Sequence, residues 1–600
     1  MTGDIKNTIF STIRRSREQG LRQLGRLARH EQIMLMTLAA ILGFVGGGSA
    51  IAFREAIEFF QLTFLGFQFG GGNILAETPW HRIILVTTGG GLLVGLCLRF
   101  LVQGRHIHSV SEVIEAATFQ GGKINLRTGL TSAAVSALSL GTGASAGREG
   151  PVVHLGATLS AFIADKLKLG RSLSRTLLGC GVAAAVAASF NAPIAGVFFS
   201  LEVVIGHYTL RAFSPIVIAS VTGTIVSRAY FGNFPAFTEL EYHVVSFLEF
   251  PAFAILGVIS AFTATAFLRS IAVTQYVVRH SRIPEWLRPA CAGLAVGLIA
   301  LLYPQVLGVG YEATDQALNQ QLAFTMLVAL LIAKIAATSI SIGLGFGAGV
   351  FSPSLFIGAM LGGAYGIVAT WAFPDLSSGP GAYTIVGMGA VAGAVLGAPI
   401  STILMVFELT GDYSITVAVM IATVIASTVT QHLYGHSFFT WQLAKRGLNP
   451  KHGGERQLLR SVRVRDVMEQ DFETVDPAAT MVEIRGKLLQ SHHGELFVID
   501  DGGALHGTIT LPDMSETAFD TSMDTLLNAE DVSRLHPPVL EPHDMLEKAI
   551  RRMDAVHEEQ IAVVRNTTSM EVVGVVRQVD VMNAYNAAIM KAHAAERGED

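Results

Sequence analysis

The chain has 600 residues, of which 50% are apolar and only 15% are charged, and its formal net charge is −5. A soluble protein of this length would carry nearer a quarter charged residues, so the composition excludes a water-soluble enzyme or sensor for the chain as a whole and predicts a mostly membrane-embedded protein. Of the 47 acids and 42 bases, residues 451–600 hold 27 and 15, which leaves 20 and 27 in residues 1–450. This distribution predicts an apolar membrane domain followed by an acidic, soluble domain.

The first predicted element is a cytoplasmic amphipathic helix over residues 1–31, lying at the membrane surface. The segment carries one lysine and six arginines before the first apolar span. Basic segments beside a membrane span stay in the cytoplasm. Apolar residues at helical spacing within such a segment are typical of interfacial helices.

Residues 32–446 form the predicted membrane domain. Stretches such as 128–147, 176–201 and 289–310 lack Asp, Glu, Lys and Arg, and each is long enough to cross ~30 Å of hydrocarbon. Other candidate helices are too short to span, which is tolerated at membrane depth only where protein or a polar cavity covers the freed backbone groups. In chain order the candidates are Met34–Arg54, Ile83–Leu101, Thr128–Leu140, Val152–Leu167, Leu177–Val204, Ser214–Val226, Pro251–Leu268, Pro289–Leu302, Thr325–Ile342, Pro353–Trp371, Tyr383–Leu396, Ile400–Leu409 and Ile415–Val429.

Two parts of this domain repeat the same pattern. Residues 141–151 (GTGASAGREGP) match residues 343–353 (GLGFGAGVFSP) in the positions of their Gly, Ala and Pro residues. A second pair follows, in which Glu202 and Glu408 each stand nine residues after an Ala-Pro-Ile proline. Helices interrupted at matching places in two membrane halves indicate a transporter built from internal repeats, here approximately 124–205 and 325–410, with an ion pathway between them.

After residue 446 the sequence becomes polar. Residues 447–461 are a predicted linker, and two similar segments follow at 462–516 and 530–586, before a polar tail at 587–600. Each segment ends with an apolar strand, a glycine and an aspartate six residues later, which are Gly507 and Asp513 in the first and Gly574 and Asp580 in the second. The pattern predicts a tandem α+β module that is soluble and cytoplasmic.

Residues 147–151 (GREGP) resemble a signature of the CLC family of chloride channels and chloride/proton exchangers, and residues 349–353 (GVFSP) resemble its second anion-binding signature. A third signature is altered, as residues 107–112 (IHSVSE). The tail resembles a pair of CBS domains. The resemblance implies an all-α polytopic membrane protein with an inverted internal repeat, a separate pathway in each subunit of a homodimer, and an α+β tandem CBS module. It also implies a multi-pass protein of the bacterial inner (plasma) membrane with both termini in the cytoplasm.

The repeated segments suit the binding of a dehydrated anion. A helix N-terminus offers unpaired N–H groups and a partial positive charge, and glycine permits close approach of the backbone. By resemblance, Glu149 is the gate and, in an exchanger, the outer proton carrier, because its carboxylate imitates the permeating anion. Arg148 and Gly150 complete this part of the anion site.

The resemblance places the central anion site on the backbone N–H groups of Val350 and Phe351. Two family hydroxyls are replaced here. The serine position falls on His108, beside Ser109, and an imidazole N–H could donate in its place. The tyrosine position falls on Phe439, which offers a ring but no O–H donor. Purely structural roles for His108 and Phe439 remain open.

The inner proton position of exchangers in this family falls on Val203, which cannot bind a proton. The neighbouring Glu202 recurs as Glu408 in the other repeat, so a structural role at a helix end is expected. His207 is an alternative proton relay. These residues favour channel-like or weakly proton-coupled anion flow.

In the tail, Thr510 and Asp513 fit a CBS pattern that contacts the phosphate and ribose of an adenine nucleotide, whereas the second copy keeps Asp580 without the hydroxyl. We expect no required cofactor and a possible adenine nucleotide at the CBS pair. A purely structural or gating role of the pair is the alternative.

The sequence therefore predicts transmembrane chloride transport through a pathway gated by Glu149 and modulated by the CBS pair. The alternatives are an obligate chloride/proton antiporter and a pathway selective for another anion, such as fluoride or nitrate. No nucleophile, metal-ligand or nucleic-acid-binding motif favours an enzyme, a metal site or a nucleic-acid partner. The expected partners are chloride, protons, the lipid bilayer and a second copy of the chain.

Overall fold

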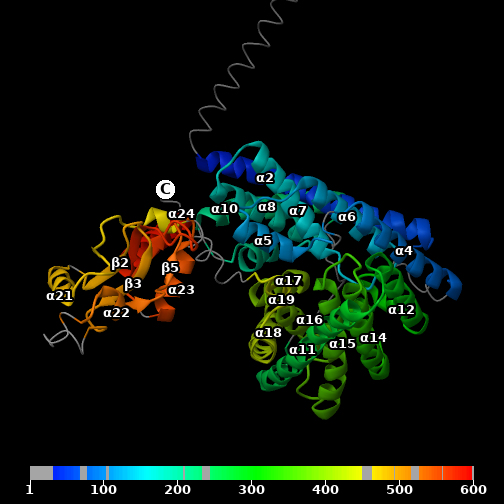
Figure 1. The fold of residues 1–600 in the computed structure, drawn as a ribbon. Helices are drawn as coiled ribbons and strands as arrows, with labels where there is room; N and C mark the ends of the chain where they lie inside the picture. The colour runs from blue at the N-terminus through cyan, green and yellow to red at the C-terminus, as the bar shows by residue number, and fades with distance from the viewer. Residues whose placement is uncertain are drawn as a thin grey trace, which may run out of the picture. The chain divides into compact units, whose positions relative to one another are not determined.

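The structure is a computed structural model that describes residues 31–67, 78–102, 104, 107–206, 208, 210–232, 244–448, 462–491, 493–514, 524, 526–556 and 558–597. The chain divides into two units, Met1–Pro450 and Lys451–Asp600, which are described separately (Figure 1). The predicted surface helix, His207 and most of the predicted linker lie outside the described residues.

The first unit is built from helices. Within the described residues, nine helices are long and apolar enough to cross a membrane. The helices are α2 (Glu31–Phe64), α4 (Trp80–Phe100), α5 (Val110–Phe119), α6 (Leu126–Gly141), α7 (Glu149–Lys166), α8 (Arg171–Phe190), α9 (Pro193–Phe199), α10 (Leu210–Phe231), α11 (Phe250–His280), α12 (Arg288–Leu302), α13 (Tyr311–Leu318), α14 (Phe324–Gly343), α15 (Phe351–Ala372), α16 (Pro380–Leu396), α17 (Pro399–Thr410), α18 (Tyr413–Tyr434) and α19 (Phe438–Lys445).

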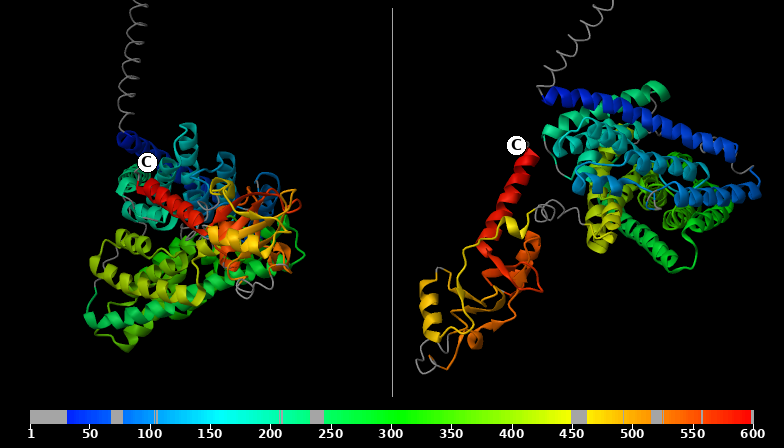
Figure 2. Two further views of the ribbon diagram at one scale, coloured as in Figure 1. Left: turned by 60° about the vertical axis from the view of Figure 1, so that its left-hand side comes forward. Right: turned by 45° about the horizontal axis from the view of Figure 1, so that its top comes forward.

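The helices form two groups that repeat one another. In the first, α7 packs on α8, α8 packs on α10, and the long α2 lies along them; in the second, α15 packs on α16 and α16 on α18. Figure 2 shows α2 in blue along the cyan helices of the first group. The order α7, α8, α9, α10 thus recurs as α15, α16, α17, α18, which is the internal repeat that the sequence predicted.

The two groups break their helices at matching places. The sequence predicted one helix over Leu177–Val204, and this was wrong: the chain ends α8 at Phe190 and starts α9 at Pro193. Asn191 adopts a left-handed conformation with φ 57°, as Gly397 does with φ 65° before α17. A left-handed residue ends a helix, and proline in the first turn begins the next one. A single turn of π-helix, η1 (Ser200–Ile205), follows α9.

The repeated glutamates connect the two groups. The carboxylate of Glu408 in α17 accepts hydrogen bonds from the N–H groups of Ile194 and Ala195 at the start of α9, at 2.9 and 2.8 Å. The carboxylate of Glu202 in η1 accepts from Ile400 and Ser401 at the start of α17, at 3.1 and 2.8 Å. Each group therefore supplies the anion that caps a helix of the other, where the first N–H groups of a helix have no intrahelical partner.

Removing one of these caps is expected to destabilise the first unit, Met1–Pro450, called the membrane unit below. Glu408→Ala leaves two N–H groups without their charged acceptor, which costs roughly 2–4 kcal/mol, and Glu408→Gln, which keeps one acceptor, should cost less. Thermal unfolding of the detergent-solubilised protein measures the effect. Asp375→Ala, at an exposed acid after α15, is the control. Equal midpoints for Glu408→Ala and Asp375→Ala would contradict the capping role.

The second unit contains two similar α+β halves. The first sheet has the order β1 (Thr474–Val475), β2 (Glu495–Ile499), β3 (Leu505–Thr510), β4 (Arg534–Leu535), and the second has β5 (Val539–Leu540), β6 (Gln560–Val564), β7 (Val572–Arg577). In both sheets a parallel pair is followed by an antiparallel pair. The helices of the unit are α21 (Met481–Gln490), α22 (Ala529–Val532), α23 (Leu546–Val556) and α24 (Gln578–Arg597). The tandem α+β module predicted from the sequence is present.

Candidate functional site

The two glycine-rich signatures meet at a short backbone bridge. The N–H of Gly147 donates to the carbonyl of Gly349 at 2.7 Å, and the N–H of Gly349 donates to the carbonyl of Gly147 at 2.7 Å. Helix α7 begins two residues after Gly147, and α15 begins two residues after Gly349. The N-termini of both helices therefore point into one region, where their partial positive charges add.

Glycine is needed at this bridge because the backbones are too close for side chains. A Cβ atom added to Gly147 would lie 2.6 Å from Oε2 of Glu149, and one added to Gly150 would lie 2.5 Å from the Ser109 hydroxyl. A Cβ atom added to Gly349 would lie 3.1 Å from the N atom of Gly150. The glycines thus let the N–H groups of two helix starts approach one small volume.

The carboxylate of Glu149 occupies the N-terminus of α15. Its Oε1 accepts hydrogen bonds from the hydroxyl of Ser352 and, at 3.2 Å, from the hydroxyl of Tyr311, and its Oε2 accepts from the N–H of Ser352 at 3.4 Å. Nε of Arg148 lies 3.9 Å from Oε1. The side chain is buried. A carboxylate held by these donors stands where an anion of similar size would be bound.

A small cavity lies next to this carboxylate. Five residues predicted from the sequence line it, namely Glu149, Gly150, Val350, Phe351 and Phe439. Apart from the Glu149 carboxylate and the backbone, its walls are apolar, and the other lining residues are Val110, Val153, Val186, Phe190, Phe199 and Gly349. A dehydrated anion in such a space would depend on backbone N–H groups and helix dipoles.

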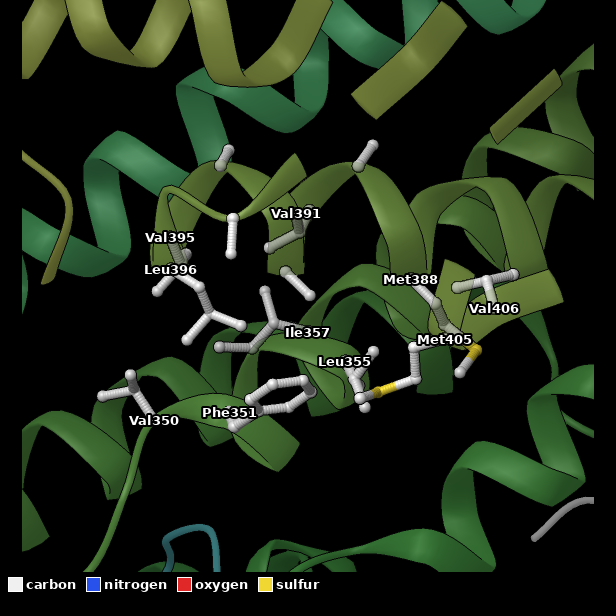
Figure 3. Packing of buried hydrophobic residues seen from close by; sticks show 14 of the residues in the cluster. Val350, Phe351, Leu355, Ile357, Met388, Val391, Val395, Leu396, Met405 and Val406 are labelled. Atoms are coloured by element: carbon white, nitrogen blue, oxygen red, sulfur yellow. The ribbon is translucent and has the colours of Figure 1, made fainter. Parts of the chain in front are cut away.

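The ring of Phe351 forms one wall and is fixed by other rings. Its centroid lies 4.9 Å from that of Phe190 and 6.0 Å from that of Phe199. Figure 3 shows the ring beside Ile357 and Leu355, against the apolar side chains of α16. The packing fixes the backbone at the start of α15. Phe439 also lines the cavity, and its side chain offers a ring but no O–H donor.

The remaining predicted residues lie around the cavity. Ser109 caps α5, and its backbone N–H donates to Oε2 of Glu112 at 2.7 Å. The guanidinium of Arg148 lies over the ring of Tyr311, 5.3 Å from its centroid, and donates to the carbonyl of Ser189 at 3.5 Å. His108 is not among the residues that line the cavity; its Nδ1 lies 3.2 Å from Oγ of Ser132.

The substituted inner proton position lies in an apolar setting. Val203 of η1 packs against the main apolar cluster of the membrane unit, and the adjacent Glu202 is engaged at the start of α17. Neither residue lines the cavity beside Glu149.

The two predicted nucleotide contacts of the second unit differ in their surroundings. Thr510 donates its N–H and hydroxyl to Asp513 at 3.1 and 2.6 Å, and Arg534 of β4 forms an ion pair with the same carboxylate at 2.8 Å. Burial opposes ionisation, but the hydrogen bonds from Thr510 and Arg534 hold the pKa of Asp513 below its usual range. In the other half, Oδ2 of Asp580 is buried without a hydrogen-bond partner among the described residues.

Tyr311 and Ser352 are site residues that the sequence analysis missed. Ser352 lies inside the predicted signature, directly after Phe351, so its place at the second position of a helix start was a usable signal. Tyr311 begins α13, a short helix that the apolar pattern did not reveal. No local signal connects Tyr311 with Glu149, which is 162 residues away in the chain.

Comparison with known proteins gives consistent results. A family model described as voltage gated chloride channel matches residues 90–431, and a CBS domain model matches residues 464–518 and 529–587. The chain is 33% identical over 405 residues to a putative chloride channel protein ClcB-like from Ralstonia nicotianae, covering 67% of this chain and 94% of that protein. It is 28% identical over 546 residues to the chloride channel protein CLC-e from Arabidopsis thaliana, covering 81% of this chain and 76% of that protein.

Solved structures share the fold. A slow cyanobacterial Cl⁻/H⁺ antiporter matches with a TM-score of 0.62 at 24% identity, covering 69% of this chain and 97% of that chain. A eukaryotic CLC transporter matches with a TM-score of 0.60 at 20% identity, covering 91% and 97%. A CLC-type fluoride/proton antiporter matches with a TM-score of 0.58 at 22% identity, covering 68% and 97%.

Proposed function

Because the chain belongs to the voltage-gated chloride channel (CLC) family and carries two CBS domains after its membrane unit, we propose that it moves chloride along a pathway gated by Glu149. Flow along this pathway is channel-like or weakly coupled to protons. One observation supports the gate above all: the Glu149 carboxylate, which comes from α7, is bound at the N-terminus of α15.

The gate follows from competition between two anions for the same donors. The ionised carboxylate is held by a backbone N–H and two hydroxyls, and each hydrogen bond to a charged group is worth about 1.5–3 kcal/mol. Protonation removes the charge and weakens these bonds, so the neutral side chain can leave. Chloride then takes the vacated N–H and hydroxyl donors, and the pathway opens.

The departures from the family pattern favour weak coupling. Val203 has no ionisable group at the inner proton position, and Phe439 supplies no hydroxyl beside the cavity. A pathway with few fixed donors on its inner side holds an anion less tightly and lets it pass without an obligatory proton exchange. We further propose that the protein acts as a homodimer with both termini in the cytoplasm, that the CBS pair modulates the pathway, and that an adenine nucleotide binds the pair.

Reconstitution into liposomes tests this function. With a chloride gradient across the membrane, the full-length protein should give a current whose zero-current potential follows the chloride gradient. An added proton gradient should shift that potential by a minor amount. Protein-free liposomes are the control. Absence of chloride flux would contradict the proposal, and so would a zero-current potential governed by the proton gradient.

A further inference from the structure

A second buried polar cluster lies beside α7, separate from the cavity. His154 of α7 is 1% exposed, and its ring centroid lies 5.6 Å from that of His108, with the planes inclined by 34°. Glu112, in the first turn of α5, interacts electrostatically with His154. Buried ionisable groups inside a membrane domain are costly and mark functional positions.

The cluster is close to the gate along α7. His154 follows Glu149 by five residues, which is about 7.5 Å along the helix axis. It follows Gly150 by four residues and therefore lies on the same face of α7 as Gly150, where an added Cβ atom would lie 2.5 Å from the Ser109 hydroxyl. Proton transfer between Glu149 and His154, as proposed below, requires water to bridge this separation.

The pair of rings is suited to hold one proton. Two imidazolium ions at this separation would repel each other strongly in a buried site, so a single positive charge is favoured. Glu112 supplies the compensating negative charge. Its carboxylate accepts from the Ser109 N–H at 2.7 Å and the Ser111 hydroxyl at 3.0 Å and is paired with the guanidinium of Arg446. These partners fix Glu112 as a counter-ion, which leaves proton binding to the imidazoles.

Glu112 is the acid that balances a proton on His154, and the other charged residues on helices packed against α7 do not take this role. Within the described residues, the ring contact of His154 is with His108, and Glu112 is the acid that interacts with it electrostatically. Helix α15 carries no charged side chain. The charged residues on the other helices against α7, besides Glu112, are Glu31, Arg54, Glu55 and Glu58 of α2, Glu115 of α5, Arg127 of α6, and Arg171 and Arg175 of α8.

The cluster also reaches the surface. The side chain of Arg446 is 35% exposed and that of Glu112 is 10% exposed. Arg446 caps the end of α19, where the chain leaves the membrane unit toward the CBS domains. Turn η1, which carries Val203, packs against α5 as well. The histidine pair thus lies against the same helix as the substituted inner proton position.

We propose that His154, paired with His108 and balanced by Glu112, is the inner proton acceptor of this protein and carries its weak proton coupling. A proton leaves the carboxyl group of Glu149 as the O–H bond breaks, passes through water, and forms an N–H bond on the neutral ring of His154. The N–H bond of His154 then breaks, and the proton passes through His108 to water on the Arg446 side. This inference rests on the proposed chloride pathway and adds a route for protons to it.

The coupling is measured as the shift of the zero-current potential that a proton gradient causes at a fixed chloride gradient. His154→Gln should abolish the shift that the unaltered protein shows. His432→Gln is the matched control, since His432 is bonded to the Thr428 carbonyl of its own helix α18. A shift retained in His154→Gln, or absent from the unaltered protein, would overturn the inference. Absence of chloride flux from the unaltered protein would instead refute the proposed function.

His108→Ser provides a second test, which decides the matter if His154→Gln does not fold. A proton held on His108 opposes protonation of His154, so removing that ring should let the proton flux reach half its maximum at a higher internal pH. A structural role of His154 would leave this pH profile unchanged. An unmoved profile would overturn the inference, and an upward shift would support it.

Discussion

Replacement of Glu149 by alanine is expected to open the pathway and to remove the pH dependence of chloride flux. The substitution deletes the carboxylate that holds the Ser352 N–H and the hydroxyls of Ser352 and Tyr311. Loss of even one such bond, worth at least about 1.5 kcal/mol, corresponds to a change in occupancy of about tenfold or more. Flux at pH 7.5 should therefore rise at least about tenfold. Glu149→Gln, which resembles the protonated residue, should act in the same direction.

Chloride efflux from liposomes at pH 4.5 and pH 7.5 measures the effect. Glu285→Ala, at an exposed acid between α11 and α12, should keep the pH dependence of the unaltered protein. Flux in Glu149→Ala that still rises on acidification would refute the gate. Flux at pH 7.5 below that of the unaltered protein would refute it as well.

Tyr311→Phe is expected to loosen the gate while keeping it pH-sensitive. The hydroxyl of Tyr311 donates to Oε1 of Glu149 at 3.2 Å, and a donor of this kind favours the charged, bound form of the carboxylate. Without it the carboxylate loses one of the donors that hold it and should leave the site more readily. The pH of half-maximal flux should move upward by about one unit, the equivalent of one charge-assisted hydrogen bond.

The same flux assay over a series of pH values tests this prediction. Tyr365→Phe is the matched control, because the Tyr365 hydroxyl donates to the Ala252 carbonyl, away from Glu149. Ser352→Ala, which removes the other hydroxyl on Oε1, should shift the midpoint in the same direction as Tyr311→Phe. If Tyr311→Phe and Tyr365→Phe gave the same midpoint, Tyr311 would have no part in the gate.

The repeat and the gate residue could be predicted because their signals are local. The glycines of both signatures sit at fixed spacing, and Glu149 stands out against Phe351 at the matching position of the second copy. The anion site forms where Gly147 and Gly349 exchange backbone hydrogen bonds. These two residues belong to segments that are about 200 residues apart in the chain. The sequence showed that two such segments exist, and the structure shows that they meet.

Other features depend on three-dimensional packing and had weaker signals. Tyr311 starts an eight-residue helix with mixed polarity, which apolar periodicity does not detect. Glu202 and Glu408 were visible as a repeated pair, but the exchange of caps between α9 and α17 follows only from the way the two groups interlock. His154 offered a usable signal, since it is an ionisable residue four positions after Gly150 in a buried helix.

In the second unit, too, local sequence signals were predictive and contacts between distant residues were not. Matching glycine and aspartate residues predicted two similar halves, and two similar sheets are present. The ion pair between Asp513 and Arg534 was not predicted, because Arg534 lies in β4, beyond the first predicted domain. The two aspartates therefore differ in their hydrogen bonding. Asp513 is paired with Arg534, whereas one carboxylate oxygen of Asp580 has no partner among the described residues.

Bromide, which replaces chloride and scatters X-rays anomalously, provides the most direct test of the account. Crystals of the unaltered protein at pH 7.5 should show a bromide peak beside the N–H groups of Val350 and Phe351. Crystals of Glu149→Gln should show a further peak at the position that the carboxylate occupies beside the Ser352 N–H. Identical peaks in the two proteins, or none near the starts of α7 and α15, would contradict the claim that Glu149 and the anion compete for one site.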